Sequence, residues 1–279
     1  MLAPIAQSQR VRCRQIAQSD LPELADLLTR GFSRSHRAYW VDGFARMQRL
    51  PPVEGMPRFG YVLESDKTPV GVLLLISSRR PDGRIFANLA GWYVEPGWRA
   101  HSALLIATAT RHRNVTYIDA SSAPHGWRTL QQQGFHLFNV GRSAIVAALS
   151  PGQGHVSEII PGDLPERDML HAHAAMGCLS LVCEKNGAVS PFIFKPRRVD
   201  RPPVRMMELI YCRSTDDFKR CVGPLSRHVL RRGALGFLLD GRVSSVLSHY
   251  VSGKEPRFYK GPEAPSLNDL AYTEKVIFG

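Results

Sequence analysis

A repeated tetrapeptide is the feature of this sequence that most restricts its fold. Asp20-Leu21-Pro22-Glu23 recurs in the second half as Asp163-Leu164-Pro165-Glu166. Aspartate suits the N-cap of a helix, proline suits the first turn, and glutamate suits the third position. Each copy therefore predicts the start of a helix. A strand-like segment, 11–16 or 157–160, precedes each copy, so the repeat predicts duplication of one strand–helix unit.

The length of 279 residues agrees with two such units. A Pro/Gly-rich turn, Ser150–Gly154, predicts the joint between a domain at 1–150 and a second domain at 155–279, which includes a C-terminal extension. Hydrophobic residues make up 44% of the chain and charged residues 22%, which is typical of a globular protein with a sizeable core. This composition excludes a disordered tail, a collagen-like rod and a small disulfide scaffold.

Hydrophobic periodicity predicts alternating strands and helices in both halves. In the first half the predicted strands are 11–16, 60–65, 70–77, 85–94, 115–120, 135–139 and 142–149, and the predicted helices are 20–31, 37–50, 99–112 and 126–133. In the second half the predicted strands are 157–160, 178–185, 188–195, 204–213 and 234–239, and the helices start at 163 and 215. This order predicts an α/β or α+β fold in which mixed, mostly antiparallel sheets are flanked by helices.

The predicted order over 10–149, together with two short motifs, resembles the GNAT superfamily of acyl-CoA N-acyltransferases. Asn88–Arg99 (NLAGWYVEPGWR), followed by Ala103-Leu104-Leu105, is similar to that family's L-x-V-x-P-x-x-R strand and helix start. Gln133-Gly134-Phe135 matches its G-F turn before the sixth strand. The resemblance implies two tandem GNAT-like domains, of which the second is a degenerate copy.

The resemblance also implies where acetyl-CoA or another acyl-CoA would bind. In this family the pantetheine arm bonds to the edge of the fourth strand, here Trp92, Tyr93 and Val94. The next loop directs backbone N–H groups at the pyrophosphate from a helix N-terminus, as orphan donors and the helix dipole favour. The matching positions are Arg99, Ala100, His101, Ser102 and Ala103. The resemblance implies no metal cofactor.

Three positions depart from the family's pattern. The loop 99–103 contains no glycine, although the family's loop is glycine-rich. Leu130 stands where many members have a tyrosine general acid, and Ala90 and Gly91 stand where a carboxylate base is often found. The candidates for proton transfer are therefore the imidazoles of His125 and His101 and the phenol of Tyr93. The alternative is that these residues have no catalytic role: the histidines would be solvated in loops and the tyrosine would be part of the core.

These observations lead to one leading hypothesis and two alternatives. The leading hypothesis is an acyltransferase that moves an acyl group from acyl-CoA to an amine or hydroxyl of a small-molecule or polymer-precursor acceptor. One alternative is a catalytically silent GNAT-fold binding module, and the other is a Fem-like transferase that uses aminoacyl-tRNA. Asp216 and Asp217, at the matching helix start in the second half, would repel an anion, so we expect the cofactor in the first half only.

The charge and the cysteines restrict partners and location. The net charge of +12 implies an anionic partner of some kind, and residues 1–150 carry 18 basic and 10 acidic side chains. The sequence contains no dense basic block of the kind that binds nucleic acid. We therefore expect no nucleic-acid partner, except the tRNA that the second alternative requires. The number of cysteines, five, is odd, and no two have C-x-x-C spacing. The first residues do not show the pattern of a secretory signal peptide. We therefore expect reduced thiols in a cytoplasmic protein that does not enter a membrane; the oligomeric state is not predicted.

Overall fold

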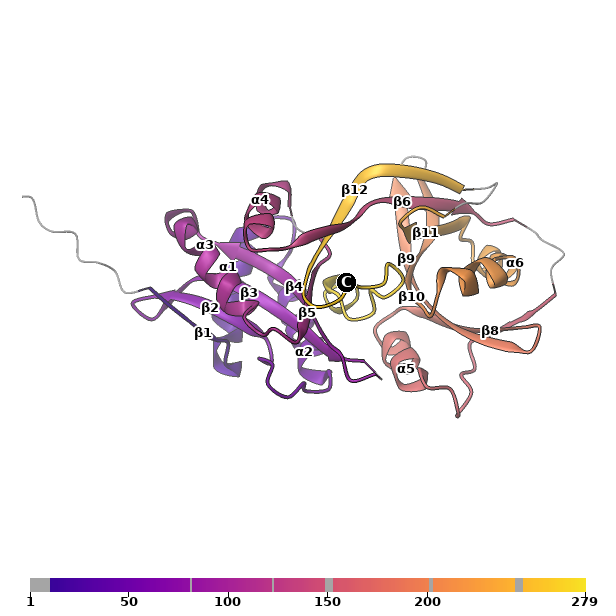
Figure 1. The fold of residues 1–279 in the computed structure, drawn as a ribbon, viewed down its shortest axis with the longest axis horizontal. Coiled ribbons are helices and arrows are strands. Elements are labelled where there is room, and N and C mark those ends of the chain that lie inside the picture. The colour runs from indigo at the N-terminus through magenta and orange to yellow at the C-terminus, as the bar shows by residue number, and fades with distance from the viewer. Residues whose placement is uncertain (1–10, 81, 122, 149–152, 201–202, 244–247) are drawn as a thin grey trace, which may run out of the picture. The chain divides into compact units, whose positions relative to one another are not determined.

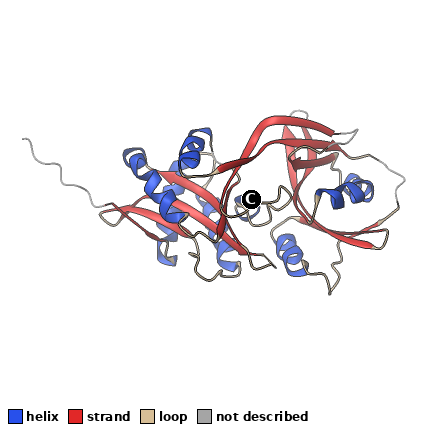
Figure 2. Cartoon of the chain, in the orientation of Figure 1, coloured by secondary structure: helices blue, strands red, loops and turns tan. Residues whose placement is uncertain are grey.

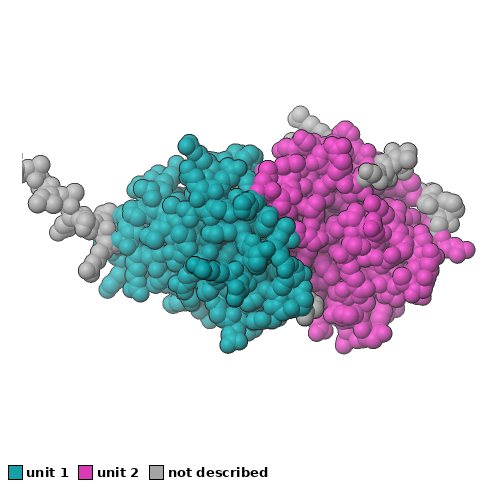
Figure 3. Space-filling model, in the orientation of Figure 1, with its two compact units in different colours: residues 1–136, 258–264, 277–279 teal, residues 137–257, 265–276 magenta. Residues whose placement is uncertain are grey.

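The computed structural model describes residues 11–80, 82–121, 123–148, 153–200, 203–243 and 248–279, which form two compact units (Figure 3). Unit 1 comprises the chain up to His136 together with Phe258–Ala264 and Ile277–Gly279. Unit 2 comprises Leu137–Arg257 and Pro265–Val276. The chain thus passes from unit 1 to unit 2 earlier than the predicted joint. Residues 150–152 of that joint lie outside the described residues.

Unit 1 is built on one mixed sheet (Figure 1). Its strands are β1 (Val11–Gln15), β2 (Gly60–Ser65), β3 (Thr68–Arg79), β4 (Ile85–Val94), β5 (Val115–Asp119) and the last three residues of β12 (Ser248–Lys260), in that spatial order. The pairing is antiparallel except between β4 and β5, which are parallel. A parallel pair requires a crossover connection, and a helix between the two strands supplies it.

Helices cover both faces of the sheet in unit 1 (Figure 2). The alternation of side chains along β3 separates the two faces. Leu73 and Leu75 share a core with α3 (Ser102–Ala109) and α4 (Pro124–Gln132). On the opposite face, Leu74 lies with α1 (Leu21–Gly31) and α2 (Arg37–Arg49), whose apolar sides supply the second buried layer.

Unit 2 is built on a second, mostly antiparallel sheet. Its strands, in spatial order, are β12, β6 (His136–Val146), β11 (Gly236–Asp240), β10 (Pro203–Cys212), β9 (Ala188–Asp200), β8 (Leu179–Lys185) and β7 (His155–Ser157). The β10–β11 pair is parallel. The helices are α5 (Arg167–Ala175), α6 (Thr215–Arg231) and most of α7 (Glu274–Ile277). Both units therefore confirm the predicted fold class.

Segments distant in sequence complete each sheet. In unit 1, Phe258, Tyr259 and Lys260 of β12 pair with β5, and Phe258 is 2% exposed within the core. In unit 2, the last five residues of β6 pair with the whole of β11, from Arg142 opposite Asp240 to Val146 opposite Gly236. The sequence predicts two strands at 135–139 and 142–149, but the structure forms the single strand β6 there.

The repeated tetrapeptide does not cap the two helices as its sequence predicts. Asp20 precedes α1, but its carboxylate accepts the Ala17 N–H at 2.7 Å and pairs with the Arg14 guanidinium at 2.6 Å. The bond from Arg14 holds the pKa of Asp20 below its usual range. In the second copy the helix begins later, at Arg167, and residues 163–166 lie in the turn before it. An ion pair and a turn have thus replaced the predicted caps.

A buried ionic cluster lies in the sheet of unit 2. Arg257 is fully buried and donates from Nε to Oδ2 of Asp240 at 2.8 Å. Glu208, 2% exposed, pairs with Lys275 at 2.6 Å and with Arg142 at 2.7 Å. Burial alone would raise the pKa of Glu208, but the surrounding cations hold it below its ordinary value. Pairing on this scale is what allows charges to be buried.

Candidate functional site

The fourth strand of unit 1 contains a β-bulge in the middle of the predicted acyl-CoA segment. Val72 pairs with Tyr93 and Leu74 pairs with Ala90, so two residues, Gly91 and Trp92, lie opposite one residue of β3. Gly91 has φ +52°, a left-handed conformation that glycine adopts without the steric cost paid by other residues. The glycine that stands where a carboxylate base was expected is therefore the residue that forms the bulge.

The pairing between β4 and β5 ends just before the bulge. The parallel ladder runs from Ile85 opposite Val115 to Leu89 opposite Asp119. Strand β4 continues to Val94, whereas β5 stops at Asp119. Among the described residues, the edge of β4 from Ala90 to Val94 has no strand partner on the β5 side. A β4 edge of this kind can accept an extended ligand through backbone hydrogen bonds.

Trp92 and Tyr93 point to opposite faces at this edge. The Trp92 ring packs against the core shared with α3 and α4, and a Cβ at Gly126 in the first turn of α4 would lie 2.9 Å from it. The Tyr93 ring lies against Gly31 at the end of α1, with its centroid 6.2 Å from that of Phe32. The indole of Trp92 therefore occupies space between β4 and α4.

The predicted pyrophosphate loop forms a tight helical turn. Residues 96–101 form a 3-10 helix that continues into α3 at Ser102. In a 3-10 helix each N–H bonds to the carbonyl three residues earlier. The Trp98 N–H accordingly donates to the Glu95 carbonyl at 2.8 Å, and the Ser102 N–H donates to the Arg99 carbonyl. These two donors are used within the turn, whereas the Arg99 side chain is exposed beside it.

The two candidate imidazoles lie in different surroundings. His125 is the second residue of α4 and is exposed. The His101 ring lies 6.0 Å from the Trp98 ring, and its Nδ1 is buried without a hydrogen-bond partner among the described residues. No hydrogen bond or ring contact between described residues links His101, His125 and Tyr93. The structure thus places all three on the elements around the β4 edge and leaves their predicted roles untested.

Two polar residues at the end of the β4–β5 ladder were missed by the sequence analysis. Asp119 is the last residue of β5, is 4% exposed, and accepts the Ser121 N–H at 3.3 Å. Asn88 on β4 is 2% exposed and donates from Nδ2 to the carbonyls of Leu89 and Ile118. A single carboxylate at the end of an apolar strand was the only sequence signal for Asp119.

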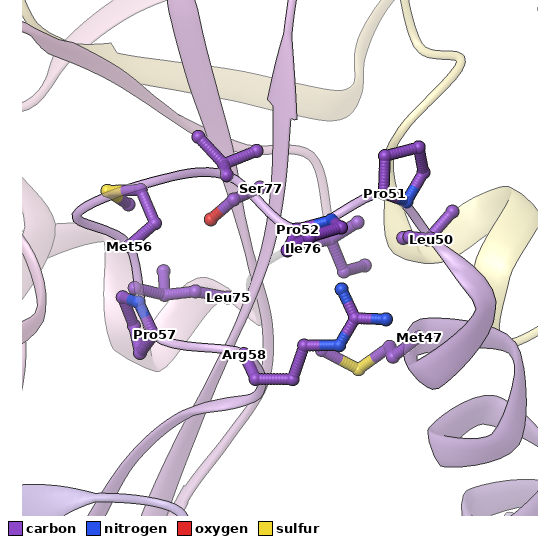
Figure 4. Close-up of a pocket in the computed structure, with 11 residues that line it drawn as sticks. Met47, Leu50, Pro51, Pro52, Met56, Pro57, Arg58, Leu75, Ile76 and Ser77 are labelled. Atoms are coloured by element: carbon purple, nitrogen blue, oxygen red, sulfur yellow. The ribbon is translucent and has the colours of Figure 1, made fainter.

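Two cavities formed by described residues of unit 1 lie away from this edge. One of about 90 Å³ lies between the end of α2, the loop that follows it and β3. Met47, Met56 and Ile76 line it, with prolines on its rim (Figure 4). A larger pocket lies at the start of β5 and is lined mainly by polar and basic side chains.

Solved structures share the architecture described above. A GCN5-related N-acetyltransferase from Anabaena variabilis superimposes with a TM-score of 0.59 at 11% identity, over 90% of this chain and 72% of that chain. The chain has the GNAT fold. A fungal GCN5-related glucosamine N-acetyltransferase region superimposes with a TM-score of 0.59 at 12% identity, over 91% of this chain and 38% of that chain. A GCN5-related N-acetyltransferase from Kribbella flavida superimposes with a TM-score of 0.52 at 11% identity, over 91% of this chain and 72% of that chain.

At the level of sequence, no family model and no curated protein matches this chain. The likeness to solved structures therefore concerns the fold. Within the part of the chain that the structure describes, no group of three His, Cys, Asp or Glu side chains is arranged to hold a metal ion. No helix there combines the length and apolar character needed to cross a membrane.

Proposed function

We propose that this GNAT-fold protein transfers an acyl group from acyl-CoA to an amine or hydroxyl. The single observation that carries the proposal is the edge of β4 from Ala90 to Val94, which includes the bulge at Gly91 and has no strand partner on the β5 side among the described residues. This edge coincides with the segment that resembles the acyl-CoA strand of the family. Isothermal titration with acetyl-CoA and with longer acyl-CoAs tests the proposal directly, and an absence of binding at millimolar concentrations would refute it.

The proposal assigns separate residues to the pantetheine arm and to the phosphates of acyl-CoA. The backbone of Trp92, Tyr93 and Val94 would hold the pantetheine arm as an added strand. At the phosphates, the proposal assigns Arg99–Ala103, with the exposed Arg99 as the main contact because its guanidinium suits a phosphate and the Ser102 N–H is already used. When bound, acyl-CoA supplies an acyl group activated as a thioester.

Replacing Gly91 with alanine tests the bulge. A Cβ at Gly91 would lie 3.0 Å from Leu74 and 3.3 Å from Leu28 and Trp40, at a φ that favours glycine. We expect Gly91→Ala to lower the free energy of unfolding of unit 1 by about 1–3 kcal/mol. We also expect it to weaken acyl-CoA binding at least 10-fold, since the bulge defines the free edge. Denaturation followed by tryptophan fluorescence and calorimetric titration measure the two effects.

Gly83 provides a matched control. It also has a positive φ, +86°, but a Cβ there would meet no described atom within 4 Å. Gly83→Ala should therefore lower the free energy of unfolding by only about 1–2 kcal/mol, the cost of the left-handed backbone conformation. It should bind acyl-CoA as the wild type does. Equal loss of binding in the two variants would show that the bulge has no specific part in the site.

Within the proposed reaction, we assign proton transfer to His125. It is exposed, and it adjoins Gly126, whose backbone packs against Trp92 of the β4 edge. His125→Gln is expected to lower kcat about 100-fold, the usual scale for a general base, with little change in KM for acyl-CoA. His101, whose ring lies beside that of Trp98, has a positioning role, so His101→Gln is expected to change kcat by less than roughly threefold.

Steady-state kinetics over a range of pH separates these roles. Disappearance of the fall in kcat toward low pH in His125→Gln alone would support the assignment, because a general base does not act in its protonated form. The reverse pattern, with the larger loss in His101→Gln, would overturn it. If both variants keep full activity, Tyr93 and the buried Asp119 are the remaining groups at this edge for the same test.

A second candidate function is a GNAT-fold binding module without catalysis. Two observations favour it: the 3-10 turn uses the Ser102 N–H internally, and the Trp92 indole occupies space beside α4. Cofactor binding without turnover across a broad panel of amines and alcohols would decide for this alternative.

The proposal extends to the organisation of the chain. We propose that unit 2 derives from duplication of unit 1, because strand, helix, three strands, helix and strand follow one another in it from β7 to β11. Asp216 and Asp217 at the start of α6 support placing acyl-CoA in unit 1 only. A cytoplasmic location and a small-molecule or polymer-precursor acceptor remain predictions from the sequence.

A further inference from the structure

A basic pocket lies in unit 1 where α3 ends and β5 begins. It has a volume of about 460 Å³, within the range of small-molecule sites. Four of the residues that line it are basic: Arg111, His112, Arg113 and Lys260. None of the lining residues is an aspartate or glutamate. The pocket therefore concentrates positive charge without a carboxylate to neutralise it.

The helix dipole gives the arginines a structural explanation that does not extend to Lys260. Arg111 and Arg113 follow the C-terminus of α3, where cations complement the helix dipole. Lys260 instead reaches the pocket from β12, at the other end of the sequence. Its Nζ contacts Thr110 Oγ1 at 3.1 Å and lies 6.0 Å from the centre of the Phe135 ring. Burial lowers the pKa of Lys260, and a bound anion would offset that cost.

Two residues that line the pocket, His112 and Tyr117, carry further hydrogen-bonding groups. His112 Nε2 is buried and has no hydrogen-bond partner among the described residues. The phenol oxygen of Tyr117 accepts the backbone N–H of His112 at 3.3 Å. A tyrosine hydroxyl is protonated at neutral pH and can donate, and burial raises the pKa of Tyr117 further, to about 12. A ligand rich in acceptor oxygens would satisfy these groups together with the cations.

We propose that this pocket binds a small phosphorylated molecule, with Arg111, Arg113 and Lys260 contacting the phosphate. A phosphate offers acceptor oxygens on several sides, which suits two guanidinium groups and an ammonium from separate segments better than one planar carboxylate does. The volume exceeds that of a bare ion, so we expect the ligand to carry a further group. A concave site of this kind favours a free metabolite over a lipid headgroup.

This site is separate from the proposed acyl-CoA edge. The β4–β5 ladder begins at Val115, which lines the pocket, and ends at Asp119, beside the free edge of β4. Four residues of strand separate the two ends by roughly 13 Å. Binding of a phosphorylated ligand here therefore does not depend on whether the acyltransferase proposal holds.

The test is isothermal titration of the full chain with inorganic phosphate and with pyrophosphate at constant ionic strength. We expect saturable binding of pyrophosphate with a Kd below roughly 1 mM. Arg111→Gln combined with Arg113→Gln should weaken it at least 10-fold, and Lys260→Met alone at least threefold. The matched control combines Arg12→Gln with Arg49→Gln, which removes the same charge from exposed sites in unit 1 outside the pocket. It should bind pyrophosphate as the wild type does.

Several results would overturn the proposal. These are an absence of saturable binding, equal weakening in the pocket and control variants, or displacement of acetyl-CoA by pyrophosphate, which would place the phosphate in the acyl-CoA site. Binding of anionic vesicles or of a single-stranded RNA that depends on Arg111 and Arg113 and is tighter than pyrophosphate binding would also contradict it. Acetyl-CoA affinity that is unchanged in the Arg111/Arg113 variant would support the separation of the two sites.

Discussion

Replacing Asp240 with leucine is expected to lower the free energy of unfolding of unit 2 by about 3–5 kcal/mol. Its partner Arg257 is fully buried, and the Nε–Oδ2 distance between them is 2.8 Å. Removing the carboxylate takes away this ion-pair partner of a guanidinium that is fully buried. Arg142, 3.6 Å from the same carboxylate, adds a second positive charge beside it.

A second substitution should reverse most of this loss. In Asp240→Leu combined with Arg257→Met, both charges are replaced by apolar side chains, and the stability should return to within about 2 kcal/mol of wild type. The exposed pair Arg84–Asp82 is the control, since both side chains are nearly half exposed, 47% and 49%. Arg84→Gln should cost less than about 1 kcal/mol. A double variant as unstable as Asp240→Leu would contradict the explanation.

The measurement must report on the correct unit. All four tryptophans, at positions 40, 92, 98 and 127, lie in unit 1. Tryptophan fluorescence therefore follows the unfolding of unit 1, whereas amide hydrogen exchange in β10 and β11 follows unit 2. Asp240→Leu is expected to accelerate exchange in those strands.

A fragment of residues 1–150, the domain that the sequence predicts, is expected not to unfold cooperatively. It lacks Phe258–Lys260, which pair with β5, and it lacks Phe278. The Phe258 ring is buried with its centroid 6.2 Å from that of Trp127, and the Phe278 ring lies 5.4 Å from that of Trp40. Loss of one buried phenylalanine alone costs about 3–5 kcal/mol, a large part of the stability of a domain.

Denaturation of this fragment followed by tryptophan fluorescence tests the expectation. Adding a peptide that spans residues 256–264 should restore part of the cooperativity, because it supplies the missing strand beside β5. A scrambled peptide of the same composition is the control. A sharp unfolding transition in the fragment alone would show that the distant segments contribute little to unit 1.

The parts of the fold that the sequence predicted are those set by local patterns. The apolar run of β4 and the periodicity of α1 and α2 lie within a few residues of their predicted limits. Gly91 inside the β4 pattern was also a recognisable signal for a bulge. The sequence analysis read this position only as a missing carboxylate, so the information was present but was interpreted as chemistry instead of backbone geometry.

The parts that were wrong or missed depend on local backbone geometry or on partners distant in sequence. The predicted helix at 99–112 is divided into a 3-10 turn and a shorter α3, which ends at Ala109. The pairing of Lys260 with Tyr117 has no local signature, so neither the strand nor the basic pocket beside it could be predicted. Asp119 looks like an ordinary strand end until the termination of the β4–β5 ladder places it at the edge of the site.

The late arrival of Phe258–Ala264 in unit 1 has a consequence for how the chain is made. As synthesis proceeds from the N-terminus, the outer edge of β5 waits for its partner until the whole stretch from Leu137 to Arg257 has been translated. At 5–20 residues per second this delay is on the order of 10 s. During that interval the nascent chain presents an open strand edge, a template for wrong pairing with other chains. We therefore expect emergence of Phe258–Ala264 from the ribosome, not emergence of residue 136, to mark the point at which unit 1 becomes protected from aggregation.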